Sequence, residues 1–348
     1  MKLTRPAVVT ALAAAIFLVG CSPTAGGDDA QSPESASSDG AFTLYSGRDE
    51  ELIQPLVDLF EEETGIEVEV RYGDTAELSA LLLEEGDSSP AQVFLSQDAG
   101  ALGALSEAGR FTTLPSELTS RVIPGFTSTD DTWVGVTGRA RVIVFDGETL
   151  TREEVPVSVD AFTDPAWAGR FGIAPGNASF QSFVTAYREL NGEAAAEEWV
   201  AGIAANRPQL FESNGAILTA VDDGVVEVGL INHYYWFRLA AETGEANMRA
   251  QLAFPEAGDA GAIVNVTGAG ILTSAASDAD ALAFLEFLLS PTAQEYFVTE
   301  TFEYPLIEGV PAAAGLPDLA SLVNPELDLA DLKSLGETQQ LLQKYGLI

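Results

Sequence analysis

Apolar positions near the start of the folded chain switch repeatedly between a strand pattern and a helix pattern. Segment 42–46 (FTLYS) is a short, largely apolar run, and segment 66–72 (IEVEVRY) has apolar residues at every second position. Both patterns predict strands. Between these strands a helix is expected, closed by Gly65, with Pro55 in its first turn, where a missing N–H costs little. Its apolar positions, at helical spacing, are Leu52, Ile53, Leu56, Val57, Leu59 and Phe60.

The alternation continues along the chain and predicts an α/β protein with largely parallel sheets. A helix over 75–86, a strand over 91–96 and a helix over 99–109 complete a first set of elements. Further strands are expected over 169–176, 225–232 and 262–272, and further helices over 180–190, 194–203, 278–289 and 331–346.

Residues 133–146 read as two strand stretches interrupted at Gly138-Arg139, a candidate crossing between two lobes. The chain returns near 262–272, so we expect two α/β lobes joined by more than one crossing. The predicted boundaries are 41–138 and 267–315 for the first lobe, and 139–266 and 316–348 for the second. Lobes joined in this way enclose a cleft that opens and shuts about a hinge.

The N-terminus predicts export. Residues 1–20 combine a basic start with an apolar core, and LVGC at 18–21 matches the lipobox at which bacterial lipoproteins are cut and lipidated. Residues 21–40 are small, polar and acidic, which predicts a disordered tether. We therefore expect an extracytoplasmic lipoprotein, anchored to the outer face of the cell membrane through lipid on Cys21. The alternative is an ordinary cleaved signal peptide followed by an unmodified cysteine.

The charge balance narrows the possible partners. The chain has 16 Lys and Arg residues against 53 Asp and Glu residues, a formal net charge of −37. Such a polyanion repels nucleic acid and anionic membrane surfaces, so neither is an expected partner. Cys21 is the only cysteine, which excludes an intramolecular disulfide. We expect a monomer that contacts the membrane through its lipid alone.

Two adjacent phenols, Tyr234 and Tyr235, follow the strand expected over 225–232. Ligands of open α/β sheets bind outside the carboxyl ends of the strands, which is where this pair lies. The chain has no G-x-S-x-G motif, no P-loop and no dinucleotide fingerprint, and its single histidine is His233. These absences favour a solute-binding protein over an enzyme.

Six stretches occur in the order YSGRDEE, TGIEVEV, SPAQVFLSQDAGAL, TGRARVIVFD, INHYYW and EYPL. Together they make residues 42–348 resemble the ferric-iron-binding proteins of bacterial ABC importers. The resemblance implies the type II periplasmic-binding-protein architecture, with a hinge and an interlobe cleft. It also implies that Tyr234 and Tyr235 bind Fe(III) as phenolates, and that an ABC permease and its ATPase receive the iron.

The resemblance leaves the other iron ligands open. Some relatives use a histidine where this chain has Asp49, followed by Glu50; Asp49 could supply a carboxylate oxygen or merely lead into the next helix. A glutamate of other relatives is replaced by Gln97, and the adjacent Asp98 suits a helix N-cap. A tyrosine used by a third branch is replaced by Phe180. The set is therefore two phenolates, or two phenolates and one carboxylate.

In the resembled family a synergistic anion, carbonate or phosphate, bridges iron and protein. Arg139 matches the arginine that clamps it, with a surface ion pair as the alternative reading. The other residues that match donors to this anion are Asn177, Ala178, Ser179, Asn214 and Asn232. The first three lie at the start of an expected helix, which is a natural site for an anion. His233 is expected to face solvent or to pack beside the site.

Two other readings remain. Tyr234, Tyr235, Trp236 and Asp49 could form a cage for an organic cation such as thiamine or a polyamine, and a charge-transfer colour with Fe(III) would separate the two ligands. From a different class, the chain could be an acidic extracytoplasmic enzyme or an adhesion lipoprotein. The enzyme lacks a nucleophile and base set, and the adhesin would not need a hinged cleft.

Overall fold

The computed structural model describes residues 38–322 and 327–348. The predicted signal peptide over 1–20, Cys21 and the tether up to residue 37 lie outside the described residues. The end of the predicted tether is bound to the folded chain. The Ser38 hydroxyl and the backbone N–H groups of Asp39 and Gly40 all donate to the Asp280 carboxylate, at 2.8, 3.1 and 2.9 Å. The fold therefore begins slightly earlier than the predicted boundary at residue 41.

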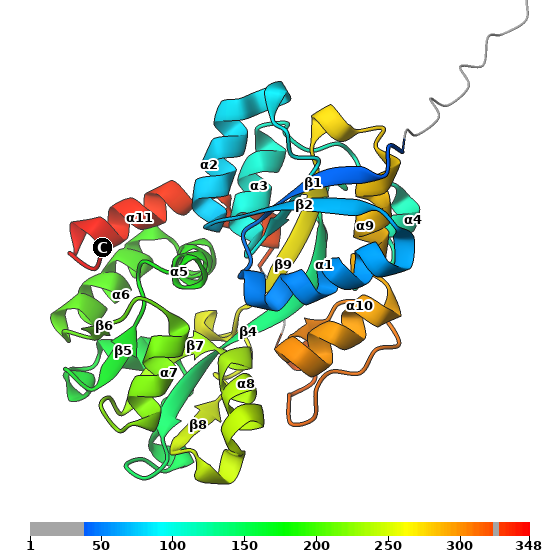
Figure 1. The fold of residues 1–348 in the computed structure, drawn as a ribbon. Helices are drawn as coiled ribbons and strands as arrows, with labels where there is room; N and C mark the ends of the chain where they lie inside the picture. The colour runs from blue at the N-terminus through cyan, green and yellow to red at the C-terminus, as the bar shows by residue number, and fades with distance from the viewer. Residues whose placement is uncertain (1–37, 323–326) are drawn as a thin grey trace, which may run out of the picture. The chain divides into compact units, whose positions relative to one another are not determined.

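The strands of the described residues form a mixed sheet in the order β2-β1-β3-β9-β4-β7-β5-β6, with β8 and β10 also paired to β4 (Figure 1). They are β1 (Ala41–Ser46), β2 (Glu67–Tyr72), β3 (Val93–Ser96), β4 (Val134–Asp146), β5 (Phe171–Ile173), β6 (Gln209–Leu210), β7 (Val228–Asn232), β8 (Ala250–Ala253), β9 (Val264–Ile271) and β10 (Tyr304–Pro305).

Helices alternate with these strands along the chain, as the colour gradient of Figure 1 shows. They are α1 (Glu50–Thr64), α2 (Thr75–Glu85), α3 (Ala99–Glu107), α4 (Ser116–Thr119), α5 (Ala178–Asn191), α6 (Glu193–Ala205), α7 (Asn214–Asp222), α8 (His233–Thr243), α9 (Ala279–Leu288), α10 (Pro291–Tyr296) and α11 (Leu335–Lys344). In the part of the chain that the structure describes, no helix combines the length and apolarity that a membrane crossing needs.

The prediction of largely parallel sheets was wrong. The outer strands are parallel, since β1 pairs with β2 and β3, and β5 pairs with β6 and β7. Among the described residues, the strands β4 and β9 run antiparallel to each other and to all their other neighbours in the sheet. Parallel neighbours need a crossover connection, usually a helix, between their ends. β4 and β9 are instead long strands that pass through the middle of the sheet in opposite directions.

β4 is one unbroken strand, which corrects the predicted interruption at Gly138-Arg139. Its first half pairs with β9, where Gly138 lies opposite Val266, and its second half pairs with β7 and β8. Gly138 serves close packing here, because a Cβ at this position would lie 3.3 Å from side-chain atoms of Leu306, Tyr304 and Val264. β4 therefore carries the backbone directly from the first half of the sheet to the second.

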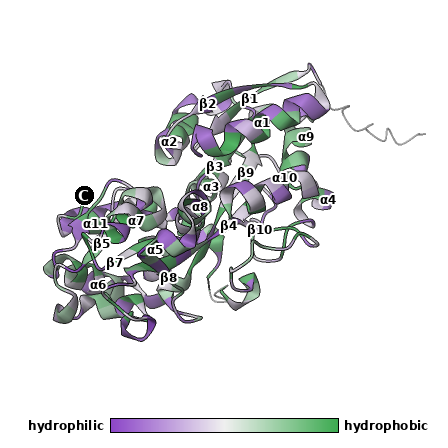
Figure 2. Ribbon diagram, turned by 60° about the horizontal axis from the view of Figure 1, so that its bottom comes forward, coloured by the Kyte–Doolittle hydropathy of each residue, from purple (hydrophilic) through white to green (hydrophobic). Residues whose placement is uncertain are grey.

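The predicted helix before Gly65 forms, but it starts earlier than expected. α1 begins at Glu50, so Pro55 lies inside the helix and not in its first turn. Two acidic residues, Glu50 and Glu51, occupy the first turn, where carboxylates are favourable. Gly65 closes the helix in the left-handed conformation at φ 73°, as predicted. Figure 2 shows green and purple alternating along such helices, in keeping with their half-buried position.

The expected C-terminal helix over 331–346 is divided in two. A 3₁₀ segment, η10 (Leu329–Lys333), packs on α3 where Gly100 leaves room, since a Cβ there would lie 2.6 Å from the Leu332 carbonyl oxygen. α11 then lies on α5, with Thr185 and Thr338 hydroxyls 2.7 Å apart. The helix breaks at Ser334. Its carbonyl and hydroxyl both accept from the Arg188 guanidinium.

Candidate metal and anion site

The tyrosine pair lies at the junction of β7 and α8. β7 ends at Asn232, and Tyr234 and Tyr235 are the second and third residues of α8. Their rings stack, with centroids 4.3 Å apart and planes inclined by 27°. Tyr235 is partly exposed, whereas Tyr234 is 1% exposed. The buried Tyr234 Oη has no hydrogen-bond partner in the described structure. A buried hydroxyl without a partner costs free energy, so this oxygen is suited to a bound ligand.

The Tyr235 phenol does not lose its proton easily in this environment. Burial raises the pKa of Tyr235 well above 10, and the neighbouring Tyr234 raises it further. The Arg48 guanidinium acts in the opposite direction on the pKa of Tyr235, and its Cζ lies 5.7 Å from the centroid of the Tyr234 ring. A strong Lewis acid is therefore needed to displace the proton of Tyr235.

Two buried arginines share one buried carboxylate beside the tyrosines. Arg48 Nη2 lies 3.1 Å from both Glu303 oxygens, and Arg139 Nε lies 3.7 Å from Glu303 Oε1. Thr301 Oγ1 also donates to Glu303, at 3.0 Å. Burial and the positive charge of Arg48 both lower the pKa of Arg139. The cluster therefore holds more positive than negative charge.

Arg139 is not in a surface ion pair, which was the alternative reading of this residue. Its side chain is fully buried, and Nη2 donates to the Val266 carbonyl at 3.2 Å. Its Nε and Nη1 have no hydrogen-bond partner among the described residues. Nε faces the Glu303 carboxylate, so Nη1 is the donor that is available to an anion.

The structure brings the other predicted anion donors together at the start of α5. Asn177 caps this helix, and its Oδ1 accepts from the Ser179 N–H at 3.1 Å and from Ser179 Oγ at 2.6 Å. Asn214 Nδ2 reaches both Asn177 Oδ1 and Ser179 Oγ at 3.2 Å, while Asn214 Oδ1 has no partner. Ala178 is the first residue of α5, so its backbone lies at the same helix start.

The arginine that reaches this group is Arg141. Its Nη1 lies 3.2 Å from Ser179 Oγ and 3.4 Å from Asn232 Oδ1, and its Nη2 donates to the Leu230 carbonyl at 2.9 Å. Burial lowers the pKa of Arg141 to about 9, an effect that Tyr235 opposes. The sequence interpretation missed Arg141. It lies two positions after Arg139 on β4, and the period of two along a strand could have indicated it.

The candidate carboxylate ligands differ in position. Asp49 is exposed at the start of α1, and its side chain makes no capping hydrogen bond. It lies close enough to Tyr235 to raise the pKa of that phenol. Glu50 is exposed in the first turn of α1. Among the described residues, no group of three or more His, Cys, Asp and Glu side chains is arranged to hold a metal ion. A metal here would rely on the phenols.

Gln97 and Asp98 have structural roles. The Gln97 N–H donates to Thr75 Oγ1 at 3.0 Å. Asp98 is 2% exposed and caps α3, where it accepts from the Ala101 N–H at 3.2 Å. The N-cap interpretation of Asp98 is thus confirmed, and the carboxylate is already engaged.

His233 and Trp236 are both turned to the protein interior. The His233 ring accepts from the Ala140 N–H at 3.1 Å, and its Nε2 lies 2.8 Å from the Phe302 carbonyl oxygen. Burial lowers the pKa of His233 to about 4. It therefore packs beside the site and does not face solvent. Trp236 Nε1 donates to the Ala250 carbonyl at 2.7 Å, on the β8 side of α8.

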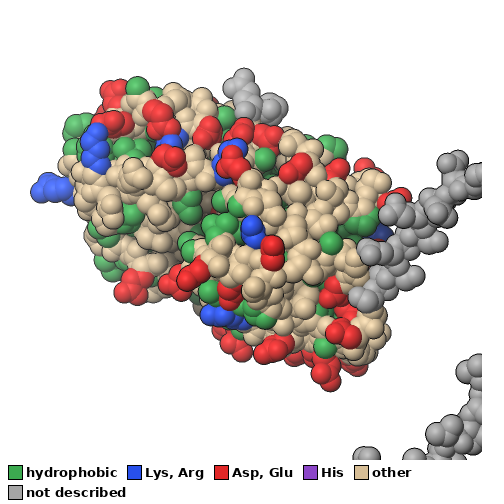
Figure 3. Space-filling view, turned by 90° about the horizontal axis from the view of Figure 1, so that it is seen from above, with side chains coloured by type: hydrophobic (Ala, Val, Ile, Leu, Met, Phe, Trp, Pro, Cys, Tyr) green, Lys and Arg blue, Asp and Glu red, His purple; other side chains and the backbone are tan. Residues whose placement is uncertain are grey.

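Arg48 and Glu303 were also missed by the sequence interpretation. Both lie in stretches that carried the resemblance, YSGRDEE and EYPL, and arginine is scarce in this acidic chain. Figure 3 shows that Asp and Glu side chains greatly outnumber Lys and Arg on the face drawn. Against this background, a cluster of buried arginines is a strong local signal of an anionic partner.

Comparison with known proteins agrees with the fold and with the resemblance. The family described as bacterial extracellular solute-binding protein matches residues 88–331. The Fe(3+)-binding periplasmic protein of Serratia marcescens is 32% identical over 316 residues, covering 90% of this chain and 93% of the relative. Among solved structures, iron-bound HitA from Pseudomonas aeruginosa has a TM-score of 0.83 and 33% identity, covering 88% of this chain and 99% of its own.

A further solved relative is Trichodesmium IdiA (FutA) in complex with iron and citrate, with a TM-score of 0.76 and 30% identity, covering 88% of this chain and all of that chain (100%). These likenesses confirm the predicted fold class, the two-lobed type II architecture of periplasmic binding proteins. The chain therefore belongs to the bacterial extracellular solute-binding protein family, among its ferric-iron-binding members.

Proposed function

We propose that this protein captures ferric iron between Tyr234 and Tyr235 and delivers it to the permease and ATPase of an ABC importer. The observation that carries the proposal is the stacked phenol pair, in which the buried Tyr234 oxygen has no partner among the described residues. Fe(III) is a hard ion of high charge, and a phenolate is a hard anionic oxygen donor. The protons must leave as the metal binds, so the affinity for iron rises with pH.

The charges of the site favour Fe(III) together with an anion. Two phenolates leave a formal +1 on bound iron, and Arg48, Arg139 and Arg141 add three positive charges, which the buried carboxylates of Glu303 and Asp98 offset only in part. A buried excess of positive charge is unfavourable. A bound carbonate or phosphate would offset this excess. Asp49 is the proposed third protein ligand, because its exposed carboxylate lies near Tyr235.

The anion is proposed to lie between Arg139 and the start of α5. Arg139 Nη1, which has no hydrogen-bond partner among the described residues, would donate to it, as guanidinium groups do to oxyanions. At the start of α5 the proposed donors are the backbone N–H groups of Ala178 and Ser179. The side chains that surround them belong to Asn177, Ser179, Asn214 and Asn232. Arg141 would hold Ser179 and Asn232 in place.

The route to the importer follows from the sequence proposals. Cys21 would carry the lipid that holds the protein on the outer face of the membrane, as a monomer. The proposed lobes, 41–138 with 267–315 and 139–266 with 316–348, would close on the iron, with β4 among their connections. The permease would then recognise the closed, loaded form.

Metal analysis with a visible spectrum tests this function. Protein loaded with Fe(III) in bicarbonate should bind one iron and show a phenolate-to-iron charge-transfer band, and the iron should be held less well without bicarbonate. Colourless protein without bound iron would contradict the proposal. The organic-cation alternative is less well supported, because Trp236 is directed toward Ala250 and not grouped with the tyrosines.

A further inference from the structure

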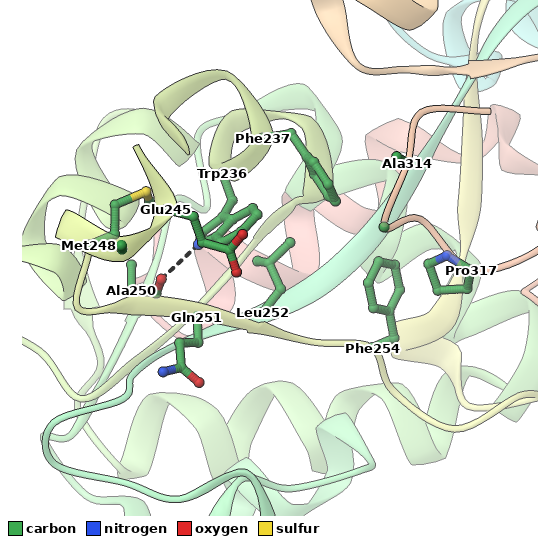
Figure 4. Close-up of a pocket in the computed structure, with 12 residues that line it drawn as sticks. Trp236, Phe237, Glu245, Met248, Ala250, Gln251, Leu252, Phe254, Ala314 and Pro317 are labelled. Carbon is green, nitrogen blue, oxygen red and sulfur yellow. Dashed lines mark hydrogen bonds between the residues drawn. The ribbon is translucent and has the colours of Figure 1, made fainter. Parts of the chain in front are cut away.

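A pocket of about 970 Å³ lies on the β8 side of α8, and neither the two tyrosines nor the buried arginines described above are among the residues that line it. Its walls come from α8, from the 3₁₀ segment η5 (Glu245–Asn247), from β8 and from residues 314–317. Figure 4 shows the Phe237, Leu252 and Phe254 side chains directed into the space between these segments. The pocket is thus formed by one stretch of the chain, residues 236–254, together with the distant segment 314–317.

Aromatic side chains line this pocket and are held in place. The Trp236 and Phe237 rings meet edge to face, with centroids 5.1 Å apart and planes at 81°. Phe237 also stacks on Phe302, at 6.1 Å and 24°. The Trp236 N–H is already used by the Ala250 carbonyl, so the indole offers an apolar π surface and no donor. Such preformed aromatic walls suit the apolar part of a small ligand.

The pocket has one charged lining residue, Glu245. Its side chain is exposed, and it forms no ion pair with a basic side chain of the described chain. The net charge of −37 adds a long-range attraction for cations. A hard metal ion would require several oxygen ligands, and a single carboxylate does not supply them. The complementary ligand is a cation that also has an apolar surface.

We propose that this pocket is a second binding site, for an organic cation that carries an aromatic or branched apolar group. The apolar group would lie against Trp236, Phe237 and Phe254, and the positive nitrogen would lie near Glu245. Aromatic faces attract such a cation through their quadrupoles, and the carboxylate adds a direct charge interaction. The site is separate from the tyrosine pair and does not depend on iron being the cargo.

Calorimetric titration of the full chain with benzyltrimethylammonium tests the proposal, with benzyl alcohol and phenylacetate as neutral and anionic comparisons. The cation should bind more tightly than the alcohol, and phenylacetate should not bind. Glu245→Gln removes the charge from an exposed position without disturbing packing, and it should weaken cation binding by up to about fivefold, as expected for an exposed charge pair. Glu242→Gln, an exposed change near the end of the preceding helix α8 and outside the pocket, should leave the affinity unchanged.

Two further variants locate the ligand. Trp236→Leu keeps an apolar wall but removes the π surface, so the cation should lose affinity relative to benzyl alcohol. Tyr235→Phe should leave cation binding as it is, whatever it does to iron. The proposal is wrong if benzyltrimethylammonium does not bind at millimolar concentration, or if Glu245→Gln and Glu242→Gln behave alike. It is also wrong if Tyr235→Phe abolishes binding, because the cation would then lie at the tyrosine pair.

Discussion

Arg48 and Glu303 form a buried ion pair in which one guanidinium nitrogen lies 3.1 Å from both carboxylate oxygens. Their side chains are 1% and 0% exposed, and they lie 255 residues apart in the chain. Arg139 approaches the same carboxylate. Glu303 therefore neutralises part of the positive charge that is gathered beside the tyrosines, and it ties the first loop of the fold to the segment before β10.

Glu303→Gln should lower the free energy of unfolding by about 3–5 kcal/mol, because it leaves two buried guanidinium groups without their carboxylate. Urea denaturation of the iron-free protein measures this change. Asp87→Asn is the matched control, since it breaks the exposed Arg110–Asp87 pair of 3.0 Å and should cost no more than about 1 kcal/mol. Similar losses in both variants would remove the special role of Glu303.

Arg139→Gln should weaken iron retention chiefly when bicarbonate is the available anion, by about tenfold to a hundredfold. The expected size follows from the ~1.5–3 kcal/mol of a charged hydrogen bond. The measurement is competition for Fe(III) against a chelator, with and without bicarbonate. The exposed change Arg121→Gln provides the control. An Arg139→Gln protein that responds to bicarbonate as the parent does would place the anion elsewhere.

The iron-free protein should lose stability as the pH falls from about 6.5 to about 4, partly through His233. Burial lowers the pKa of this residue from 6.5 to about 4 in the folded state. Within this window the unfolded chain binds a proton that the native imidazole does not accept, so the stability falls by up to about 3 kcal/mol. Urea denaturation across this range should show a shallower pH dependence in His233→Gln than in the parent. Parallel curves would contradict this origin.

Cys21→Ser should release the protein from the membrane, because a serine hydroxyl is not a substrate for thiol lipidation. Fractionation of expressing cells would find the variant in the soluble extracytoplasmic fraction and the parent with the membranes. A variant that stays with the membrane fraction would mean that something other than lipid on Cys21 anchors the chain.

Much of the fold could be predicted because its signals are local. The spacing of apolar residues indicated α1, Gly65 marked its end, and the apolar run over 225–232 located β7 and the tyrosines after it. The continuity of β4 could not be predicted, because Gly138 breaks a strand pattern locally and is accommodated only by β9 and β10. α7 was missed as an element, although the sequence had singled out Asn214, its first residue.

The charged half of the site was less predictable. Arg48 and Glu303 are 255 residues apart in the sequence, and no local pattern relates two residues at that separation. Arg141 was hidden by its neighbour Arg139, which alone matched the resemblance. The alternative reading grouped Trp236 with the tyrosines in a cation cage, but its indole N–H donates to the Ala250 carbonyl of β8, a contact that no local sequence pattern indicates.

The central claim is that Tyr234 and Tyr235 bind Fe(III) as phenolates. Tyr→Phe at either position keeps the ring and the 4.3 Å stack while removing one oxygen, so folding should change little. The buried Tyr234 Oη has no partner among the described residues, so its removal breaks no hydrogen bond in the iron-free protein.

The measurement is iron content together with the visible spectrum of the parent, the two single variants and the double variant after loading with Fe(III) in bicarbonate. Each single variant should lose about 100-fold or more of its affinity for iron and show a shifted charge-transfer band. This loss is larger than the loss caused by changing a residue that only supports a metal ligand, which is about 10-fold to 100-fold. The double variant should be colourless. If the double variant holds iron with the affinity and spectrum of the parent, the two phenols are core aromatics and the claim is wrong.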